Sequence, residues 1–220
     1  LIQLGRRAIL ALRQNLISKI HEHDNTNLYK QFKDLIGDIY TAEVHHVRPK
    51  AVILMDDEGN EIVLPKEKQI PNDYFKKGDN VRGVIENVEL KGNKPQIIMS
   101  RTAPEFLEKL FEQEIPEVFD GTVEIMSVSR EAGDRTKVAV RSHNPNVDAI
   151  GTIVGRGGSN IKKVVSRFHP TRLDAKTGIE VPVEENIDVI QWVEDPAEFI
   201  YNAIAPAEVD YVLFDEDDSK

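Results

Sequence analysis

The sequence contains no cysteine, which excludes disulfide bonds and thiolate metal sites. This absence fits a reducing compartment, and we expect a cytoplasmic protein. No apolar run approaches the roughly 20 residues of a membrane-spanning helix, and no secretory signal pattern stands at the front, so we expect no membrane partner. An initiator methionine is also lacking, since the chain opens on Leu1, and we expect a fragment of a longer protein.

The 220 residues exceed the usual size of one domain, so two or three small domains are expected. With 40% hydrophobic and 30% charged residues, the composition is that of a packed protein rather than a disordered one. The net charge of −10 is unevenly distributed: residues 130–176 hold ten basic and four acidic residues (+6), whereas residues 194–220 hold nine acidic residues and one lysine (−8). Exposed charges are screened beyond about 10 Å, so the local excess governs phosphate binding.

Two kinds of periodicity divide the first half of the chain. Apolar residues at helical spacing predict an amphipathic linker helix over 6–20, with a basic outer face; they are Ile9, Leu12, Leu16 and Ile20. Between residues 39 and 101 the period becomes alternating, which predicts five short strands, at 40–47, 51–55, 61–64, 80–88 and 96–100. Five strands in about 65 residues suit a small closed OB-type β-barrel. Its longer connection is expected at 66–74.

The second half is predicted to be a mixed α/β domain, which makes the whole chain an α+β multidomain protein. An acidic helix over 104–119 is followed by two strands and then by two helices joined by glycines. An irregular stretch leads to a third strand, a helix that Asp195 begins, and a last strand with nothing after it to pair. The predicted elements after the acidic helix are strands 122–129 and 137–142, helices 148–154 and 159–168, strand 187–193, a helix to Ile204 and strand 209–214.

The most informative motif is the glycine loop Gly155-Arg156-Gly157-Gly158 between the two helices. Glycines lack Cβ atoms, so this backbone can closely approach a sugar-phosphate chain, and the following helix directs free N–H groups toward a phosphate. The alternative is a glycine-rich connection that lets two helices pack closely. The motif is not a P-loop, because no G-K-[ST] follows. The expected RNA-binding residues are Ile150, Ile153 and Val154 as an apolar floor for bases, with Gly155, Arg156, Gly157, Gly158, Ser159, Asn160, Lys162, Lys163 and Arg167.

A second candidate nucleic-acid surface lies on the barrel, because OB barrels hold single strands with basic grooves and aromatic side chains. Its residues are Lys50, Tyr74, Lys76, Lys77 and Arg82. A spacer or protein-docking role is the alternative for this aromatic-poor barrel. We expect no metal site, because His45 and His46 point to opposite faces of a strand and residues 56–60 lack the ligand spacing of an EF-hand and suit a hairpin turn. No catalytic site and no cofactor are expected.

The glycine loop resembles the KH signature, a GXXG loop that clamps single-stranded nucleic acid. The order strand–strand–helix–loop–helix–strand resembles the bacterial type II arrangement, and the barrel is similar to the S-one RNA-binding repeat. This order of modules resembles the bacterial NusA family of transcription elongation, termination and antitermination factors. Detailed likeness lies at 70–71, 95–102, 119–121, 144–148 and 195–200. Gly157 and the long stretch 169–185 depart from the family pattern.

The resemblance implies four segments: residues 1–35 as the end of a polymerase-binding domain, 36–101 as the S-one-type barrel, 102–194 as a type II KH domain, and 195–220 as the start of a second KH domain with an acidic end. It implies binding of nascent single-stranded RNA, RNA polymerase and other elongation factors by a monomer. The alternative is a cap-like subunit of an RNA-degrading exosome-type complex, which also carries a barrel before a KH domain.

Overall fold

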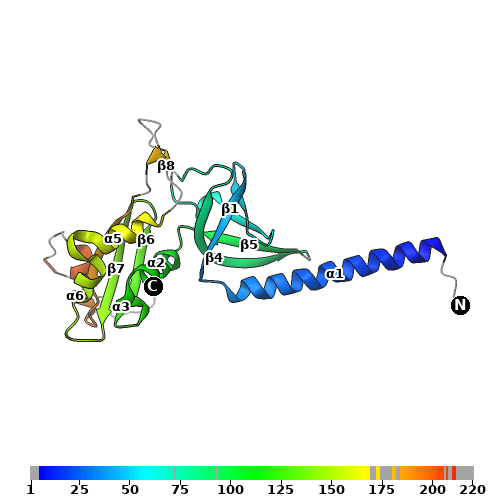
Figure 1. Ribbon diagram of the computed structural model, residues 1–220. Coiled ribbons are helices and arrows are strands. Elements are labelled where there is room, and N and C mark those ends of the chain that lie inside the picture. Colours follow the sequence, from blue (N-terminus) through cyan, green and yellow to red (C-terminus); the bar gives the residue numbers. More distant parts are fainter. Residues whose placement is uncertain are drawn as a thin grey trace. The chain divides into compact units, whose positions relative to one another are not determined.

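The computed structural model describes residues 5–71, 73–92, 94–168, 172–173, 180–181, 184–205, 207 and 210–211 (Figure 1). The chain divides into two compact units. The first contains Leu1–Gln69 and Phe75–Arg101, and the second contains Ile70–Tyr74 and Thr102–Lys220. The α+β class is confirmed. Among the described residues, no helix is both long enough and apolar enough to span a membrane.

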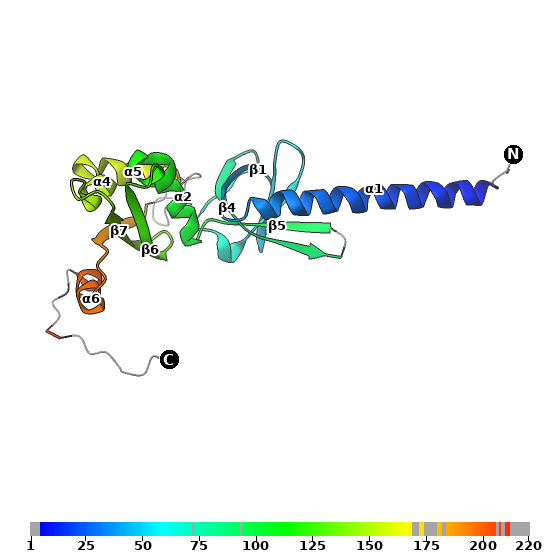
Figure 2. The same cartoon turned by 90° about the horizontal axis from the view of Figure 1, so that it is seen from below.

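Helix α1 (Arg6–Asp34) is 29 residues long, so the predicted helix over 6–20 ended too early. The sequence between His21 and Asp34 has no glycine or proline to interrupt it. The last turns lie along β4 and β5 of the barrel (Figure 2), where Phe32 is buried and Leu28 and Tyr29 pack beside it. Tertiary packing of these residues therefore extends the helix beyond its amphipathic first half.

The first unit is a closed barrel with strand order β1-β2-β3-β5-β4. Neighbouring strands are antiparallel except β3 and β5, which are parallel. The strands are β1 (Ile39–Val47), β2 (Ala51–Met55), β3 (Glu61–Pro65), β4 (Asn80–Lys91) and β5 (Lys94–Ser100). The core is formed by Phe32, Ala42, Val44, Val52, Leu54, Ile62, Leu64, Phe75, Val81, Ile85, Val88, Ile97 and Met99. All five predicted strands are confirmed, and the alternation of buried and exposed residues explains why they were recognisable.

The connection between β3 and β4 does not belong wholly to the barrel. It begins with the short 3-10 helix η1 (Lys66–Lys68), but Ile70–Tyr74 belongs to the second unit. A Cβ atom on Gly133 would lie 2.7 Å from Cγ2 of Ile70, so glycine permits the close packing of the β6–β7 turn on this segment. The predicted longer connection is confirmed, and its part Ile70–Tyr74 is grouped with the second unit.

The second unit is built on a three-stranded sheet of order β10-β7-β6, in which β7 pairs antiparallel with β6 and parallel with β10. The strands are β6 (Val123–Glu131), β7 (Arg135–Ser142) and β10 (Asn186–Gln191), and the helices are α2 (Pro104–Glu114), α3 (Pro116–Phe119), α4 (Ala149–Val154), α5 (Ser159–Ser166) and α6 (Pro196–Ile204). Buried residues of the sheet and of the helices form the core; they include Phe106, Leu107, Leu110, Phe111, Val123, Val138, Val140, Ile153, Val164 and Phe168.

Three details of the second unit differ from expectation. The acidic helix over 104–119 breaks at Ile115, which is extended (φ −122°, ψ 108°) because Pro116 disfavours a helical conformation in the residue before it. The stretch predicted to be irregular includes two short paired strands, β8 (Arg172–Leu173) and β9 (Glu180–Val181). The strand predicted over 209–214 falls almost entirely outside the described residues, and the described Asp210 and Tyr211 are not in a strand.

The predicted start of helix α6 is confirmed. The Asp195 carboxylate accepts a hydrogen bond from the Glu198 backbone N–H at 3.3 Å, and proline follows at the first helical position. This is the capping arrangement that the Asp-Pro pair predicts.

Candidate nucleic-acid interface

The glycine loop joins α4 to α5 as predicted, and its backbone is tightly folded. The Gly155 N–H donates to the Gly151 carbonyl at 2.8 Å, and the Gly158 N–H donates to the Gly155 carbonyl at 3.1 Å. Gly155, Gly157 and Gly158 all have positive φ, at 71°, 63° and 78°. Residues other than glycine rarely adopt this region, so the spacing of glycines seen in the sequence is a requirement of the turn.

The three glycines of the loop have different surroundings. A Cβ atom on Gly155 would lie 2.7 Å from Ser159 Oγ and 2.9 Å from the Asn160 backbone nitrogen, whereas one on Gly157 or Gly158 would meet nothing within 4 Å. The Asn160 side chain also donates to the Thr152 carbonyl at 2.8 Å and so ties α5 to α4. Gly155 and Asn160 therefore shape the loop, while Gly157 presents an open backbone surface.

Several exposed cations of the second unit lie on the loop and on α5. Arg156, Lys162 and Lys163 are exposed, and none forms an ion pair with another described residue. Arg167 is engaged, since its Nε lies 2.6 Å from Glu114 Oε1. Elsewhere in the basic segment, Arg135 and Lys137 pair with Asp188, and Arg141 pairs with Glu124. Among the described residues of the segment, three exposed cations without an ion pair therefore lie on the loop and on α5.

The apolar floor predicted beneath the bases is only partly available. Ile150 and Val154 are half-buried, but Ile153 is fully buried in the core. The expectation that Ile153 contacts a base is therefore wrong, because none of its surface is accessible. It supports α4 from within, and any direct apolar contact is left to Ile150 and Val154.

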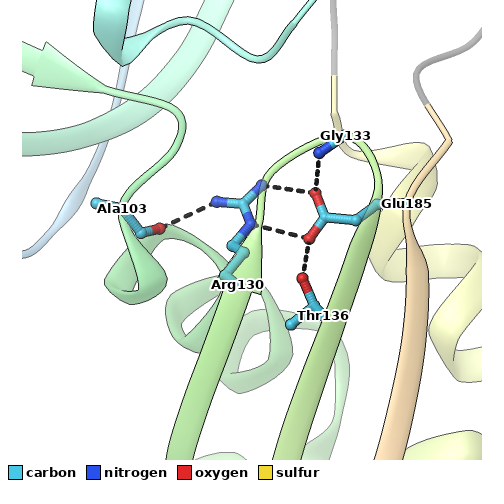
Figure 3. A network of polar contacts seen from close by, with 5 residues as sticks. All are labelled: Ala103, Arg130, Gly133, Thr136 and Glu185. Atoms are coloured by element: carbon cyan, nitrogen blue, oxygen red, sulfur yellow. Dashed lines mark hydrogen bonds and ion pairs between the residues drawn. The ribbon is translucent and has the colours of Figure 1, made fainter.

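A buried ion pair that the sequence did not predict lies at the end of the sheet (Figure 3). Arg130 Nε lies 2.9 Å from Oε1 of Glu185, and Arg130 Nη2 lies 2.9 Å from Oε2. Both side chains are 0% exposed. The carboxylate also accepts hydrogen bonds from the Gly133 backbone N–H at 3.0 Å and from the Thr136 hydroxyl. Fifty-five positions separate the two ionised residues. No local spacing could therefore have revealed the pair.

Arg130 has further partners, and together they define the charge state of Glu185. Its Nη1 donates to the Ala103 carbonyl at 3.0 Å, and the rings of Phe106 and Phe168 flank the guanidinium at 5.7 and 5.3 Å. Burial by itself raises the pKa of Glu185, but the hydrogen bonds and attraction from Arg130, with those from Thr136 and Gly133, outweigh burial and lower that pKa. Glu185 is therefore held as a carboxylate.

The structure does not bring all five barrel candidates into one unit. Lys50, Lys76 and Lys77 are exposed in turns of the barrel and Arg82 is half-buried on β4, but Tyr74 belongs to the second unit. The turn that carries Lys76 and Lys77 is joined to β1, since the Gly78 N–H donates to the Val44 carbonyl at 2.9 Å. The three lysines are therefore exposed in two different turns of the barrel, while Arg82 lies on β4.

The two histidines of β1 do not point to opposite faces, so that prediction is wrong. The register of β1 against β2 shifts between Val44 and His46, and this bulge breaks the alternation. The rings of His45 and His46 lie 4.2 Å apart. Within the described part of the chain, no group of three or more His, Cys, Asp or Glu side chains is placed to hold a metal ion.

The acidic segment 56–60 is the hairpin turn that the sequence predicted. The Asp56 carboxylate accepts hydrogen bonds from the backbone N–H groups of Glu58 and Asn60 at 3.0 and 2.7 Å, and from the Tyr40 hydroxyl at 2.9 Å. Burial and the neighbouring Asp56 carboxylate raise the pKa of Tyr40 to about 12. The acidic cluster thus closes the β2–β3 turn.

Comparison with known proteins places the loop in a recognised domain. Residues 101–175 match the family described as the NusA-like first KH domain. Proteins named transcription termination/antitermination protein NusA are similar over almost the entire chain. The relative from Thermus thermophilus is 35% identical over 99% of the chain, and those from Halalkalibacterium halodurans and Bacillus subtilis are each 36% identical over 97%. The chain spans about half the length of these relatives (53%, 52% and 54%).

Proposed function

We propose that this chain, which is 35–36% identical to proteins named NusA over about half of their length, holds single-stranded nascent RNA during transcription elongation, termination and antitermination. One observation carries the proposal. Gly157 and Gly158 present open backbone beside three exposed cations, Arg156, Lys162 and Lys163, that no described acidic group neutralises. A backbone without Cβ atoms next to positive charge is what recognition of a sugar-phosphate chain requires.

Each part of the site contributes a distinct contact to the bound strand. The Gly157 backbone meets the phosphates, and N–H groups in the first turn of α5 direct their positive dipole end toward them. Lys162 and Lys163 add charge one turn further on. Ile150 and Val154 offer apolar surface to splayed bases, which a duplex does not present. Ser159 lies at the start of α5, and Arg167 contributes only through the N–H groups that Glu114 leaves.

The basic residues Lys50, Lys76, Lys77 and Arg82 of the barrel are proposed as secondary contacts for the same strand, on the ground of charge alone. The partners proposed from the relatives' role are RNA polymerase and other elongation factors. We further propose that the protein acts by binding rather than by catalysis, as a cytoplasmic monomer. The relatives reported above are all named as transcription proteins, so the exosome-type alternative is not favoured.

The double variant Arg156→Asp/Gly157→Asp tests the RNA-binding proposal. It places two carboxylates where cation and open backbone meet phosphate, and aspartate tolerates the positive φ of Gly157. Affinity for a fluorescein-labelled, unstructured 16-nucleotide RNA should fall more than about tenfold. The matched control is Arg13→Asp/Asn15→Asp, which makes the same charge change on exposed positions of α1 and should leave affinity within about twofold.

A duplex of the same RNA supplies the second arm of this experiment. It should bind far more weakly than the single strand at equal salt, because its bases are stacked and paired. Equal affinity of the loop variant and its control for the single strand, with unchanged circular dichroism, would overturn the proposed site. Capture of core RNA polymerase by this chain is the corresponding test of the polymerase partner.

A further inference from the structure

The Arg130 guanidinium is a junction of three parts of the second unit. It binds both oxygens of Glu185 at 2.9 Å and the Ala103 carbonyl at 3.0 Å. The aromatic rings of Phe106 and Phe168 lie on it, and these rings are 5.8 Å from each other. The fork of a guanidinium fixes the direction of each of these contacts, so Arg130 defines where its partners stand relative to one another.

Two of these partners are the ends of one connection. Phe168 stands two residues after the end of α5, and Glu185 immediately precedes β10. The sixteen residues 169–184 lie between them. A turn of two or three residues would fix α5 against β10 through the chain itself. Although β8 and β9 pair within it, a connection of this length fixes α5 against β10 less tightly than so short a turn would, because the cost of closing a loop rises with its length.

We propose that Arg130 and Glu185 are positioning residues for RNA binding: they hold α5, and with it the Gly155–Gly158 loop, against the sheet in place of a short covalent turn. This inference rests on the proposed function. Helix α5 follows the loop directly and is only eight residues, about 12 Å, long. Any displacement at Phe168 is therefore carried to Ser159 and the loop glycines.

Val164 and Phe168 pack in the core of the second unit, and the described polar contacts of α5 to other elements do not replace this junction. Arg167 pairs with Glu114 of α2, but that guanidinium is about half exposed and solvent weakens such a pair. Asn160 ties α5 to α4, which moves together with the loop. Arg130, on β6, contacts the end of α5 through Phe168, the residue before β10 through Glu185, and the start of α2 through Ala103.

The test replaces both ionised residues, Arg130→Met/Glu185→Met, so that neither charge is left unpaired in the core. Such replacements of a buried pair are often tolerated by the fold. RNA affinity, measured with the labelled 16-nucleotide strand, should fall at least fivefold while circular dichroism still shows a folded chain. The control Val123→Ala removes buried volume at the other end of β6 and should leave affinity within twofold.

A readout in the absence of RNA separates positioning from general loss of stability. The amide resonances of Gly155, Gly157 and Gly158 should shift in Arg130→Met/Glu185→Met but not in Val123→Ala. Should the double variant fail to fold, Phe168→Leu keeps an apolar side chain and removes only the ring beside the guanidinium. It should lose at least threefold in affinity, and an unchanged affinity would overturn the inference.

Shortening the connection supplies the rescue. Replacing residues 170–183 by a four-residue Gly/Asn/Ser linker leaves a link of six residues between Phe168 and Glu185, long enough to span about 20 Å. In the Arg130→Met/Glu185→Met background this link should restore at least half of the lost affinity on a logarithmic scale. The short link again restricts the position of α5 relative to β10.

The possible outcomes distinguish this inference from the proposed function. Wild-type affinity in Arg130→Met/Glu185→Met, while Arg156→Asp/Gly157→Asp still fails to bind, would overturn the positioning role and leave the RNA site standing. A loss that the short linker does not restore would also overturn it. If Arg156→Asp/Gly157→Asp bound RNA as well as the wild type, the proposed function itself would fail.

Discussion

The second unit holds three cations at the loop and one at the end of the sheet that lie within one basic stretch of sequence. They differ in exposure and in pairing. At the loop, Arg156, Lys162 and Lys163 are exposed and pair with no described acidic residue. At the end of the sheet, the side chain of Arg130 is 0% exposed and donates two hydrogen bonds to Glu185. The comparison teaches that net charge along a sequence does not reveal which cations are available to a ligand. Burial and pairing decide that.

The largest expected difference between the two groups is in stability. Arg130→Met leaves the Glu185 carboxylate buried without its cation, which should lower the free energy of unfolding by about 3–5 kcal/mol. Arg156→Met removes an exposed charge and should change it by less than about 0.5 kcal/mol. Urea denaturation of both variants at neutral pH measures the two values. Equal losses would mean that the two arginines are not distinguished by burial.

Salt concentration should change RNA binding by the loop cations more than it changes the stability contributed by Arg130 and Glu185. Three or four phosphate contacts from Arg156, Lys162, Lys163 and the partly engaged Arg167 predict a slope of log affinity against log salt of about −2 to −3. The same change in salt should leave the Arg130–Glu185 contribution to stability nearly unchanged, because a buried pair is screened much less. RNA titrations and urea denaturation at matched salt concentrations check both statements. A slope near zero would show that phosphate contacts do not carry the binding.

The smallest expected effect concerns pH. The pKa of Glu185 is lower in the folded chain than its ordinary value, so its contribution to stability is present above the unfolded-state pKa. It is lost as the pH falls from about 5 through the folded-state pKa. Arg130→Met/Glu185→Met should therefore show a shallower decline in the free energy of unfolding than the wild type over this range. Parallel declines would show that Glu185 does not gain stability from its ionised state.

Features that depend on neighbouring residues in the sequence could be predicted, whereas features that depend on tertiary contacts could not. The strands and the loop glycines were predictable, because alternation and the positive φ of Gly155 are local demands. The full length of α1 was not, since its last turns depend on Phe32 packing in the barrel core. The bulge at His45 likewise depends on how β1 pairs with β2.

The candidate site shows the same division. Arg156, Lys162 and Lys163 were found because they lie within eight positions of one another around the glycines. Ile153 was assigned to the ligand because its spacing could not tell a floor from a core residue. Arg130 and Glu185 were missed because they meet only after the sheet has formed, and nothing in either neighbourhood marks a partner 55 positions away.

The most direct test of the loop as the RNA grip is a map of amide chemical-shift changes during titration with the unstructured 16-nucleotide RNA. The largest chemical-shift changes should fall on Gly155, Arg156, Gly157 and Gly158 and on the first turn of α5. Smaller changes are expected at the barrel turns that carry Lys50 and Lys76. A map whose largest changes lie on the barrel, with the loop glycines unmoved at saturation, would contradict the account.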